Sequence, residues 1–184
     1  MADLLPHLGA GPVLELGCGN GKTLKPLMAA GVEAVGLDVS WNILSRLPRA
    51  AAVVLGDAVS LPFRDGSFSA VIDIHCTGHL GASGRAIAAR ECLRVLRPGG
   101  HLVVERLTPD DLRASQGTPV EGEPGMKQVQ DGRRTHFSDA KDIIAEHSAG
   151  GFVAISSAQE RREPGHRGRL VTRESVRVVL RKPS

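Results

Sequence analysis

The sequence predicts an α/β fold in which helices cover both faces of a largely parallel sheet. Short apolar runs rich in β-branched residues alternate with segments of helical periodicity through the first 105 of the 184 residues, which is the pattern of successive βαβ units. A glycine-rich loop joins the first of these runs to a helix, as in nucleotide-binding domains of this class. The length suits one domain that spans residues 1–184.

The individual elements follow from the apolar runs and from the turn residues that separate them. Strands are expected at residues 12–16, 32–37, 51–55, 68–74, 101–105, 152–157 and 175–180. Helices are expected at residues 22–30, 41–47, 82–96 and 139–147. Within the third helix, Ala88, Cys92 and Leu96 recur at helical spacing, so we expect them to face the core.

Turn and capping residues mark where these elements should stop. Pro98-Gly99-Gly100 is expected to end the third helix, and Ser138 to cap the start of the fourth. Residues 108–134 lie between them, are rich in Gly, Pro, Asp and Gln, and lack sustained periodicity. A connection of this length inside a small domain is usually functional or mobile, so we expect a mobile loop.

Composition narrows the range of partners. The net charge is only +3, but residues 160–184 hold eight Lys or Arg against three Glu, which suits either an anionic partner such as RNA or a solvated Arg-rich strand pair. The three cysteines lack C-x-x-C spacing, so no disulfide framework or metal site is expected. The chain shows no signal-peptide pattern and no apolar run of about 20 residues, so we expect a cytoplasmic protein without membrane contact.

The strongest motif is the segment from Glu15 to Gly21, which reads Glu-Leu-Gly-Cys-Gly-Asn-Gly. Glycines let the backbone turn tightly and approach a ligand closely. An acidic residue, Asp38, ends the second predicted strand, where a carboxylate can accept hydrogen bonds from both ribose hydroxyls or simply cap the next helix. Asp57 follows the third strand, in a position to face an adenine amino group.

These segments together resemble the class I S-adenosylmethionine-dependent methyltransferases, in the branch often called type 11. The resemblance covers residues 11–106. Within that range it rests on the motifs above and on the segments 56–63, 68–73 and 93–105. It implies a Rossmann-like three-layer αβα sandwich whose seven-stranded sheet has an antiparallel last strand. It also assigns S-adenosylmethionine as the cofactor and the residues that bind it: Glu15, Gly17, Cys18, Gly19, Gly21, Asp38, Val39, Asp57 and Ala58.

Two nucleotide-binding alternatives fit the glycine-rich loop less well. Gly21-Lys22-Thr23 ends like a P-loop, but the first glycine of that motif would fall at Leu16. A nicotinamide dehydrogenase needs a glycine where this chain has Lys22. A third alternative keeps the fold and the cofactor but serves as a non-catalytic scaffold.

The methyl acceptor should lie beyond the fourth strand. His75 and His79 follow that strand, and His136 closes the long loop. Histidine titrates near neutral pH, so each is a candidate base or hydrogen-bond partner, or else a polar anchor. The segment 73–80 lacks an Asn-Pro-Pro-Tyr type of sequence, which makes an amide or nucleobase amino group a less favoured acceptor.

A narrower resemblance connects the chain with tRNA wobble-uridine carboxymethyl methyltransferases. It rests on Gly-Cys-Gly-Asn-Gly-Lys at 17–22, on His79-Leu80 and on Arg85. It implies a tRNA acceptor and a small zinc-binding activator subunit, whereas a small-molecule O, S or C acceptor fits the motifs equally. DNA is not expected as a partner. Because few residues precede the first strand, we expect residues 108–134, the substrate or another chain to cover the acceptor.

Overall fold

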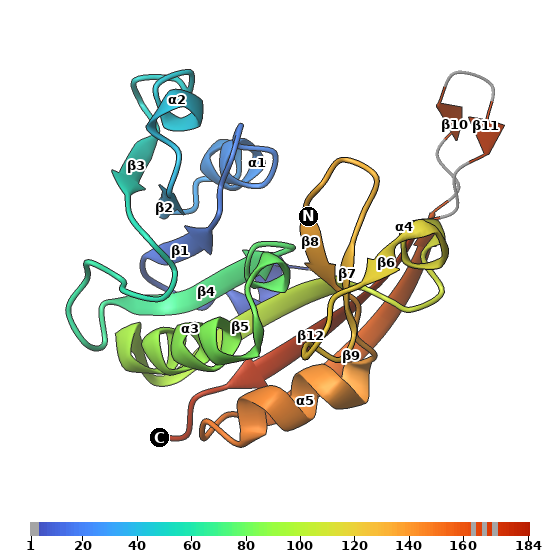
Figure 1. The fold of residues 1–184 in the computed structure, drawn as a ribbon. Coiled ribbons are helices and arrows are strands. Elements are labelled where there is room, and N and C mark those ends of the chain that lie inside the picture. Colours follow the sequence, from blue (N-terminus) through green and yellow to red (C-terminus); the bar gives the residue numbers. More distant parts are fainter. Residues whose placement is uncertain (1–3, 163–164, 167–168, 171–172) are drawn as a thin grey trace.

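A seven-stranded sheet forms the centre of the computed structural model, which describes residues 4–162, 165–166, 169–170 and 173–184 (Figure 1). Its strands are β1 (Val13–Leu16), β2 (Ala34–Asp38), β3 (Ala52–Leu55), β4 (Phe68–Ile74), β5 (Leu96–Leu107), β9 (Val153–Arg162) and β12 (Arg173–Arg181). They lie in the order β3-β2-β1-β4-β5-β12-β9. The pairs from β3 to β5 are parallel, whereas β12 is antiparallel to both β5 and β9. The predicted mostly parallel sheet with a reversed last strand is confirmed.

Helices cover the sheet on both faces and make three layers. The helices α1 (Leu24–Ala29) and α2 (Trp41–Leu44) share one face with the N-terminal 3-10 turn η1 (Leu5–His7), while α3 (Ala82–Val95) and α5 (Ala140–Ser148) pack on the other (Figure 1). None of the helices in the described ranges has both the length and the apolar character that a bilayer crossing requires.

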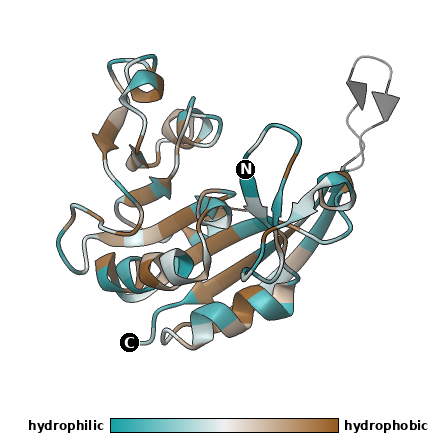
Figure 2. Cartoon of the chain, viewed as in Figure 1, coloured by the Kyte–Doolittle hydropathy of each residue, from teal (hydrophilic) through white to brown (hydrophobic). Residues whose placement is uncertain are grey.

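Alternation along the central strands supplies a core to each face. In β4, Ala70 and Ile72 point to the α1 face, whereas Val71 joins the cluster under α3 and α5. In β5, Val103 and Val104 divide in the same way. Hydropathy along the ribbon shows the result, because the central strands are the most hydrophobic part of the chain (Figure 2). This pattern is what a sheet buried on both faces requires.

The connection at 108–134 is more ordered in its secondary structure than the sequence predicts. It contains α4 (Leu112–Gln116), β6 (Thr118–Pro119) and β7 (Met126–Gln128), and β7 pairs antiparallel with both β6 and β8 (Arg134–His136). A small apolar cluster stabilises this unit and consists of Leu107, Ala114, Val129 and Phe137. Short pairing of this kind leaves no helical or strand periodicity for a sequence argument to detect. The remaining elements are η2 (Thr77–His79), β10 (Gly165–His166) and β11 (Arg169–Leu170).

Several predicted boundaries need correction. The third predicted helix ends at Val95 and β5 begins at Leu96, so Pro98-Gly99-Gly100 lies inside the first part of that strand rather than ending the helix. Ser138 does not cap α5. Asp139 occupies that position, and the Asp142 carboxylate accepts its N–H at 3.2 Å, while Ser138 is fully buried.

Candidate functional site

The glycine-rich loop lies between β1 and α1 and is held tightly by its neighbours. Gly17 has a φ of +60°, and a Cβ placed on it would come within 2.7 Å of the Cys76 Sγ. The Cys18 N–H donates to the Leu37 carbonyl at 3.0 Å, which ties the loop to β2. Gly36 in β2 lies against Cys18 in turn, since a Cβ there would approach the Cys18 Sγ to 2.7 Å. The loop is therefore a fixed surface, close to the backbone of two strands.

Glu15 presents a buried carboxylate without a complete set of partners. The residue is 5% exposed, and its Oε2 has no hydrogen-bond partner among the described residues. Burial raises the pKa of this carboxyl to about 7, and the nearby Asp38 charge adds to the rise against opposing hydrogen bonds from Thr23 and Leu24. A buried acceptor of this kind needs a donor from outside the chain. The ammonium group of an amino-acid moiety is one that fits.

Asp38 holds the carboxyl end of β2 beside this loop. Its Oδ2 accepts the Gly19 N–H and its Oδ1 accepts the Ser40 N–H, both at 2.9 Å. The Ser40 side chain makes no cap bond to α2, so the carboxylate serves both the loop and the helix start. Because an ionised carboxylate has about four acceptor positions, each oxygen of Asp38 can still accept a bond from a ribose hydroxyl.

The adenine end of the predicted site lies farther along the same edge. Asp57 follows β3 and its Oδ1 accepts the Val59 N–H at 3.1 Å, while Ala58 is buried. Val39 follows Asp38 and leaves 69% of its surface exposed, which provides an apolar contact for a base. The strand order β3-β2-β1 brings Glu15, Asp38 and Asp57 to one edge, where open α/β sheets bind ligands. These residues fit an adenosyl amino acid.

The segment after β4 is shaped by Asp73 and by an unusual backbone. Asp73 is buried and accepts the N–H groups of Cys76 and Thr77 at 3.0 Å as well as the Thr77 hydroxyl. His75 adopts a φ of +62°, which is uncommon for a residue with a side chain and marks sites under functional constraint. Its Nε2 lies 3.7 Å from the Glu105 Oε1. Burial lowers the pKa of His75, against the opposing charges of Glu105 and Asp73.

The structure brings the three predicted histidines around one cavity of about 290 Å³. His79 lies in η2, and its Nδ1 is 2.7 Å from the Arg134 carbonyl oxygen, a contact that joins η2 to β8. His136 comes from β8, and its Nδ1 is 2.7 Å from the Ser138 Oγ. Burial lowers the pKa of His136 to about 4, with help from the charges of Arg85 and Arg106, so this imidazole is neutral at pH 7.

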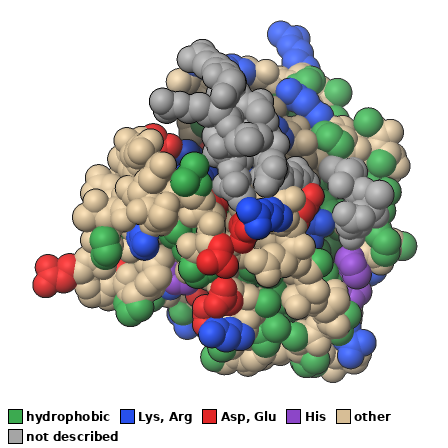
Figure 3. Space-filling model, turned by 90° about the vertical axis from the view of Figure 1, so that its right-hand side faces the viewer, with side chains coloured by type: hydrophobic (Ala, Val, Ile, Leu, Met, Phe, Trp, Pro, Cys, Tyr) green, Lys and Arg blue, Asp and Glu red, His purple; other side chains and the backbone are tan. Residues whose placement is uncertain are grey.

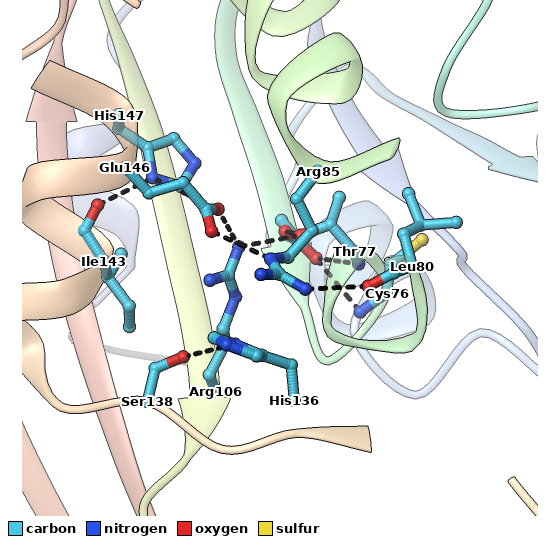
Figure 4. A network of polar contacts seen from close by, with 11 residues as sticks. Cys76, Thr77, Leu80, Arg85, Arg106, His136, Ser138, Ile143, Glu146 and His147 are labelled. Carbon is cyan, nitrogen blue, oxygen red and sulfur yellow. Dashed lines mark hydrogen bonds and ion pairs between the residues drawn. The ribbon is translucent and has the colours of Figure 1, made fainter. Parts of the chain in front are cut away.

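Sequence reasoning missed Arg106, which reaches the same cavity from β5. It is 2% exposed, and its Nη2 donates to the Glu146 Oε1 at 2.6 Å and to the Thr77 Oγ1 at 3.2 Å (Figure 4). Arg85 donates through Nε to the other oxygen of Glu146 at 2.8 Å. In the sequence, Arg106 is simply a charged residue directly after the predicted strand 101–105. That position does not indicate which groups its guanidinium contacts.

Cations dominate the rest of the cavity wall. Besides Arg106, the lining residues with a fixed positive charge are Lys22, Arg113, Arg133 and Arg173. Lys22 directly follows the glycine-rich loop, so this basic cavity and the predicted cofactor site are neighbours. The sequence predicted the loop and the histidines, but it did not predict that five cations among the described residues would line the cavity together with the histidines.

Comparison with known proteins shows where this chain belongs. Residues 14–104 match the family described as "Methyltransferase domain". The chain is 42% identical over 106 residues to a demethylmenaquinone methyltransferase of Beutenbergia cavernae, covering 54% of this chain and 43% of that protein. It is 37% identical over 94 residues to the mouse protein named "Probable tRNA methyltransferase 9B", covering 50% of this chain and 21% of the relative. The chain therefore spans less than half the length of these curated relatives.

The fold has close counterparts among solved structures. A crystal structure of an S-adenosylmethionine-dependent methyltransferase from Methanosarcina mazei superposes with a TM-score of 0.84 over 100% of this chain and 98% of that one, at 20% sequence identity. The shared fold agrees with the three-layer sandwich predicted from the motifs.

Proposed function

We propose that this chain, which belongs to the class I S-adenosylmethionine-dependent methyltransferases, transfers the methyl group of S-adenosylmethionine to an acceptor bound in the adjoining basic cavity. One observation carries the proposal. The buried Glu15 Oε2, which lacks a partner among the described residues, lies with Asp38 beside a glycine-rich loop at the ends of neighbouring strands. That combination suits a ligand with an ammonium group at one end and ribose hydroxyls at the other.

In this proposal, different residues of the chain bind different parts of the cofactor. Glu15 would accept a hydrogen bond from the amino-acid portion, Asp38 would accept from the ribose hydroxyls, and Asp57 from the adenine amino group. Val39 would cover one face of the adenine. When bound, S-adenosylmethionine supplies an activated methyl group on a sulfonium, and the chain has only to align the nucleophile with it.

The histidines of the cavity would accept any proton that the methyl acceptor loses. The acceptor atom forms its bond to the methyl carbon with its own electron pair, while the carbon–sulfur pair stays on sulfur and S-adenosylhomocysteine leaves. A hydroxyl or thiol acceptor also releases a proton, which the neutral imidazole of His136, or His79 or His75, can accept. A carboxylate acceptor needs no base.

Both acceptor classes remain within the proposal, a small molecule and a modified tRNA base. The cavity volume of about 290 Å³ lies near the lower end for small-molecule sites. The basic C-terminal stretch gives RNA less support, because Arg161 pairs with Glu174 at 3.4 Å and Arg177 with Glu105 at 2.6 Å. On the face drawn in Figure 3, acidic and basic side chains lie interleaved near the centre. The side chains of residues 162–172 lie outside the part of the chain whose side chains the structure describes.

The proposal has two further parts: the segment that covers the acceptor side of the cavity, and a possible partner subunit. Residues 108–134 bring Arg113 and Arg133 to the cavity, so movement of this segment would open and close the acceptor side as a lid. A small zinc-binding activator, expected from the tRNA-enzyme resemblance, would have to contact exposed apolar surface such as Trp41 or Leu55. Hydrogen exchange over 108–134 and light scattering of the purified chain test these two points.

Calorimetry with S-adenosylhomocysteine tests the central proposal. We expect micromolar binding, which corresponds to roughly 8 kcal/mol, and no comparable binding of ATP. A labelled-methyl screen against total tRNA and a metabolite extract then identifies the acceptor class. A chain that binds ATP tightly and ignores S-adenosylhomocysteine would refute the proposal.

Histidine variants separate an enzyme from a non-catalytic scaffold. In an enzyme, His79→Ala or His136→Ala should lower turnover of the identified acceptor while sparing cofactor affinity. If a partner complex forms normally with both variants and no methyl transfer is detected with any acceptor, the scaffold alternative holds.

A further inference from the structure

We propose that the basic cavity binds an oxyanion of the methyl acceptor, a carboxylate or a phosphate, on the guanidinium of Arg106. This assignment rests on the proposed function and names the chemical class of its substrate. It arises from three observations that the proposed function does not use: a buried cation with two nitrogens that lack a partner among the described residues, a described cavity wall of one charge sign, and the place of the balancing carboxylates.

Arg106 is built as a receptor rather than as a simple structural ion pair. Its Nη2 is fixed by Glu146 and Thr77, but its Nε and Nη1 are buried and have no hydrogen-bond partner among the described residues. Buried donors in folded proteins are nearly always satisfied, and each exception needs an explanation. Because both nitrogens are covered in this structure, an anion that entered from the cavity lined by Arg106 and displaced the covering groups would supply the missing acceptor, in a charge-assisted hydrogen bond.

The described part of the cavity wall around Arg106 consists of cations and neutral groups. Arg113 comes from α4 and Arg133 from the turn before β8, and Lys22 adds a cation from the side of the glycine-rich loop. Lys22 and Arg173 are exposed and form no ion pair within the described residues. Among the residues that the structure describes, no Asp or Glu lines this cavity, so the field of this part of the wall concentrates anions there.

The described carboxylates that pair with these cations are not among the residues that line the cavity. Asp111 is 1% exposed and contacts the Arg113 Nε at 3.2 Å, and Asp131 pairs with Arg133. Glu146 reaches Arg106 from α5 and shares its charge with Arg85. Glu105 lies on the His75 side at 3.7 Å, and Asp73 is enclosed by its own N–H donors. The acids therefore hold the cations in place without occupying the cavity.

Neutral His136 completes the site. Figure 4 shows it beside Arg106, with its ring held by Ser138. Because burial holds the pKa of His136 at about 4, its ring is neutral near pH 7 and adds no charge that would bind the anion too tightly for turnover. The wall thus combines one buried, oriented cation with several exposed ones, which suits recognition of a single anionic group.

The carboxylate of the cofactor itself is the competing source of the same chemistry, because Lys22 adjoins the glycine-rich loop. The test therefore uses the chain saturated with S-adenosylhomocysteine, whose own carboxylate is already placed. Inorganic phosphate and benzoate serve as the two oxyanion probes. Arginine Nε–H resonances in ¹⁵N-labelled protein report binding, and the resonance that disappears in Arg106→Met is assigned to Arg106.

We expect both probes to saturate and to shift the Arg106 Nε–H resonance, and we expect whichever matches the acceptor better to bind more tightly. Arg106→Met should weaken probe binding by about tenfold, the loss of one charge-assisted bond. Arg113→Met, which leaves the Arg106–Glu146–Arg85 contacts intact, should weaken it by about threefold through lost long-range attraction and keeps the test valid if Arg106→Met folds poorly. The matched control is Arg90→Met, an exposed arginine on α3, which should have no effect.

Equal probe affinity in Arg113→Met, Arg106→Met and Arg90→Met would overturn the proposal. It would also be overturned if Arg106→Met weakened S-adenosylhomocysteine but not methylthioadenosine, which lacks the amino-acid carboxylate, because the cavity would then hold the cofactor. Either result leaves the methyltransferase proposal standing. Failure of the wild-type chain to bind S-adenosylhomocysteine at all would instead refute the proposed function, and the acceptor assignment with it.

Discussion

Two neighbouring regions at one edge of the same sheet carry opposite charge. The ends of β1, β2 and β3 present Glu15, Asp38 and Asp57, whereas the described residues that line the cavity beyond β4 and β5 include cations and no carboxylate. The acidic region suits hydroxyl, amino and ammonium donors. The basic region suits an anion. The acidic region lies at the ends of β1 to β3 and most of the basic region lies beyond β4 and β5, so one fold can hold a donor-rich cofactor and an anionic acceptor a short distance apart.

The two regions also differ in how they are assembled. The acidic region uses residues that lie within a few positions of a strand end and are fixed by local backbone bonds, such as those from Gly19 and Ser40 to Asp38. The basic region gathers side chains from the loop after β1, from β5, from α4 and from β8. It depends on long-range packing, so the two regions should respond differently to mutation.

The largest expected effect is on the basic region. Glu146→Ala removes the carboxylate that Arg85 and Arg106 share and leaves two buried guanidinium groups uncompensated. Breaking a buried ion pair in this way costs about 3–5 kcal/mol of unfolding free energy. Urea denaturation measures the loss. The exposed acid Asp65, which is paired with Arg94, provides the matched control, and Asp65→Ala should cost under about 1 kcal/mol.

The pH dependence of this pair provides a second readout. Burial raises the pKa of Glu146, but the hydrogen bond and charge of Arg106 and the bond from Arg85 outweigh it and hold the pKa at about 2. A carboxyl with a lowered folded pKa stabilises the fold above its ordinary pKa of about 4.5 and loses that contribution as the pH falls toward 2. The wild-type chain should therefore lose stability over this window, and Glu146→Ala should lose less. Parallel profiles for the two proteins would contradict the assignment.

A smaller effect is expected in the acidic region. Asp38→Ala removes the acceptor for Gly19 and for the ribose hydroxyls, and charge-assisted hydrogen bonds are worth about 1.5–3 kcal/mol each. Calorimetry should show S-adenosylhomocysteine bound at least about tenfold more weakly. Benzoate or phosphate binding in the basic cavity should be unchanged, because no cation of its wall contacts Asp38. If both ligands weakened together, the two regions would not be independent.

Gly17→Ala should produce a still smaller loss, in both stability and cofactor affinity. A left-handed φ costs a residue with a Cβ about 1–2 kcal/mol, and the new methyl would also press on Cys76. Adding Cys76→Gly removes both atoms that the new methyl would press on, the Cys76 Sγ and Cβ, but not the φ, so it should restore only part of the stability lost. Thermal unfolding of the single and double variants distinguishes the two contributions, and full restoration would show that backbone strain is unimportant there.

The smallest effect expected near neutral pH comes from His136. Its pKa of about 4 means that its Cε1–H resonance should stay constant between pH 6 and 8 and move only in acid. Because the unfolded chain takes up this proton near pH 6.5, stability should fall as the pH drops from about 6.5 to 4. NMR titration, with His136→Gln to assign the resonance, measures this. A midpoint near 6.5 would show that the ring is exposed to water.

The features that could be predicted from the sequence are those that depend on residues close together in the chain. The features that were missed depend on contacts between residues far apart in the chain. The alternation of strands with helices and the glycine-rich loop follow from short local patterns typical of βαβ units, whereas the reversed last strand was expected only from the family resemblance. The boundaries shifted where one element passes directly into another, as at Val95 and Leu96. Arg106 gave no local signal, because its function depends on Glu146, forty residues away. The antiparallel pairing of β6, β7 and β8 was missed for the same reason: each strand is too short to show a period.

The close packing at Gly36 has a consequence for how such a sequence can evolve. Gly17 is held by its own backbone, so no neighbouring change can release it. Gly36 has no left-handed φ, and a side chain is excluded there only because Cys18 and Leu24 lie within 2.9 Å of the position that a Cβ would take. A descendant could acquire alanine at this position if it also acquired smaller residues at the other two. Among diverging copies of this chain, we expect Gly17 to stay invariant, while Gly36, Cys18 and Leu24 drift as a linked group.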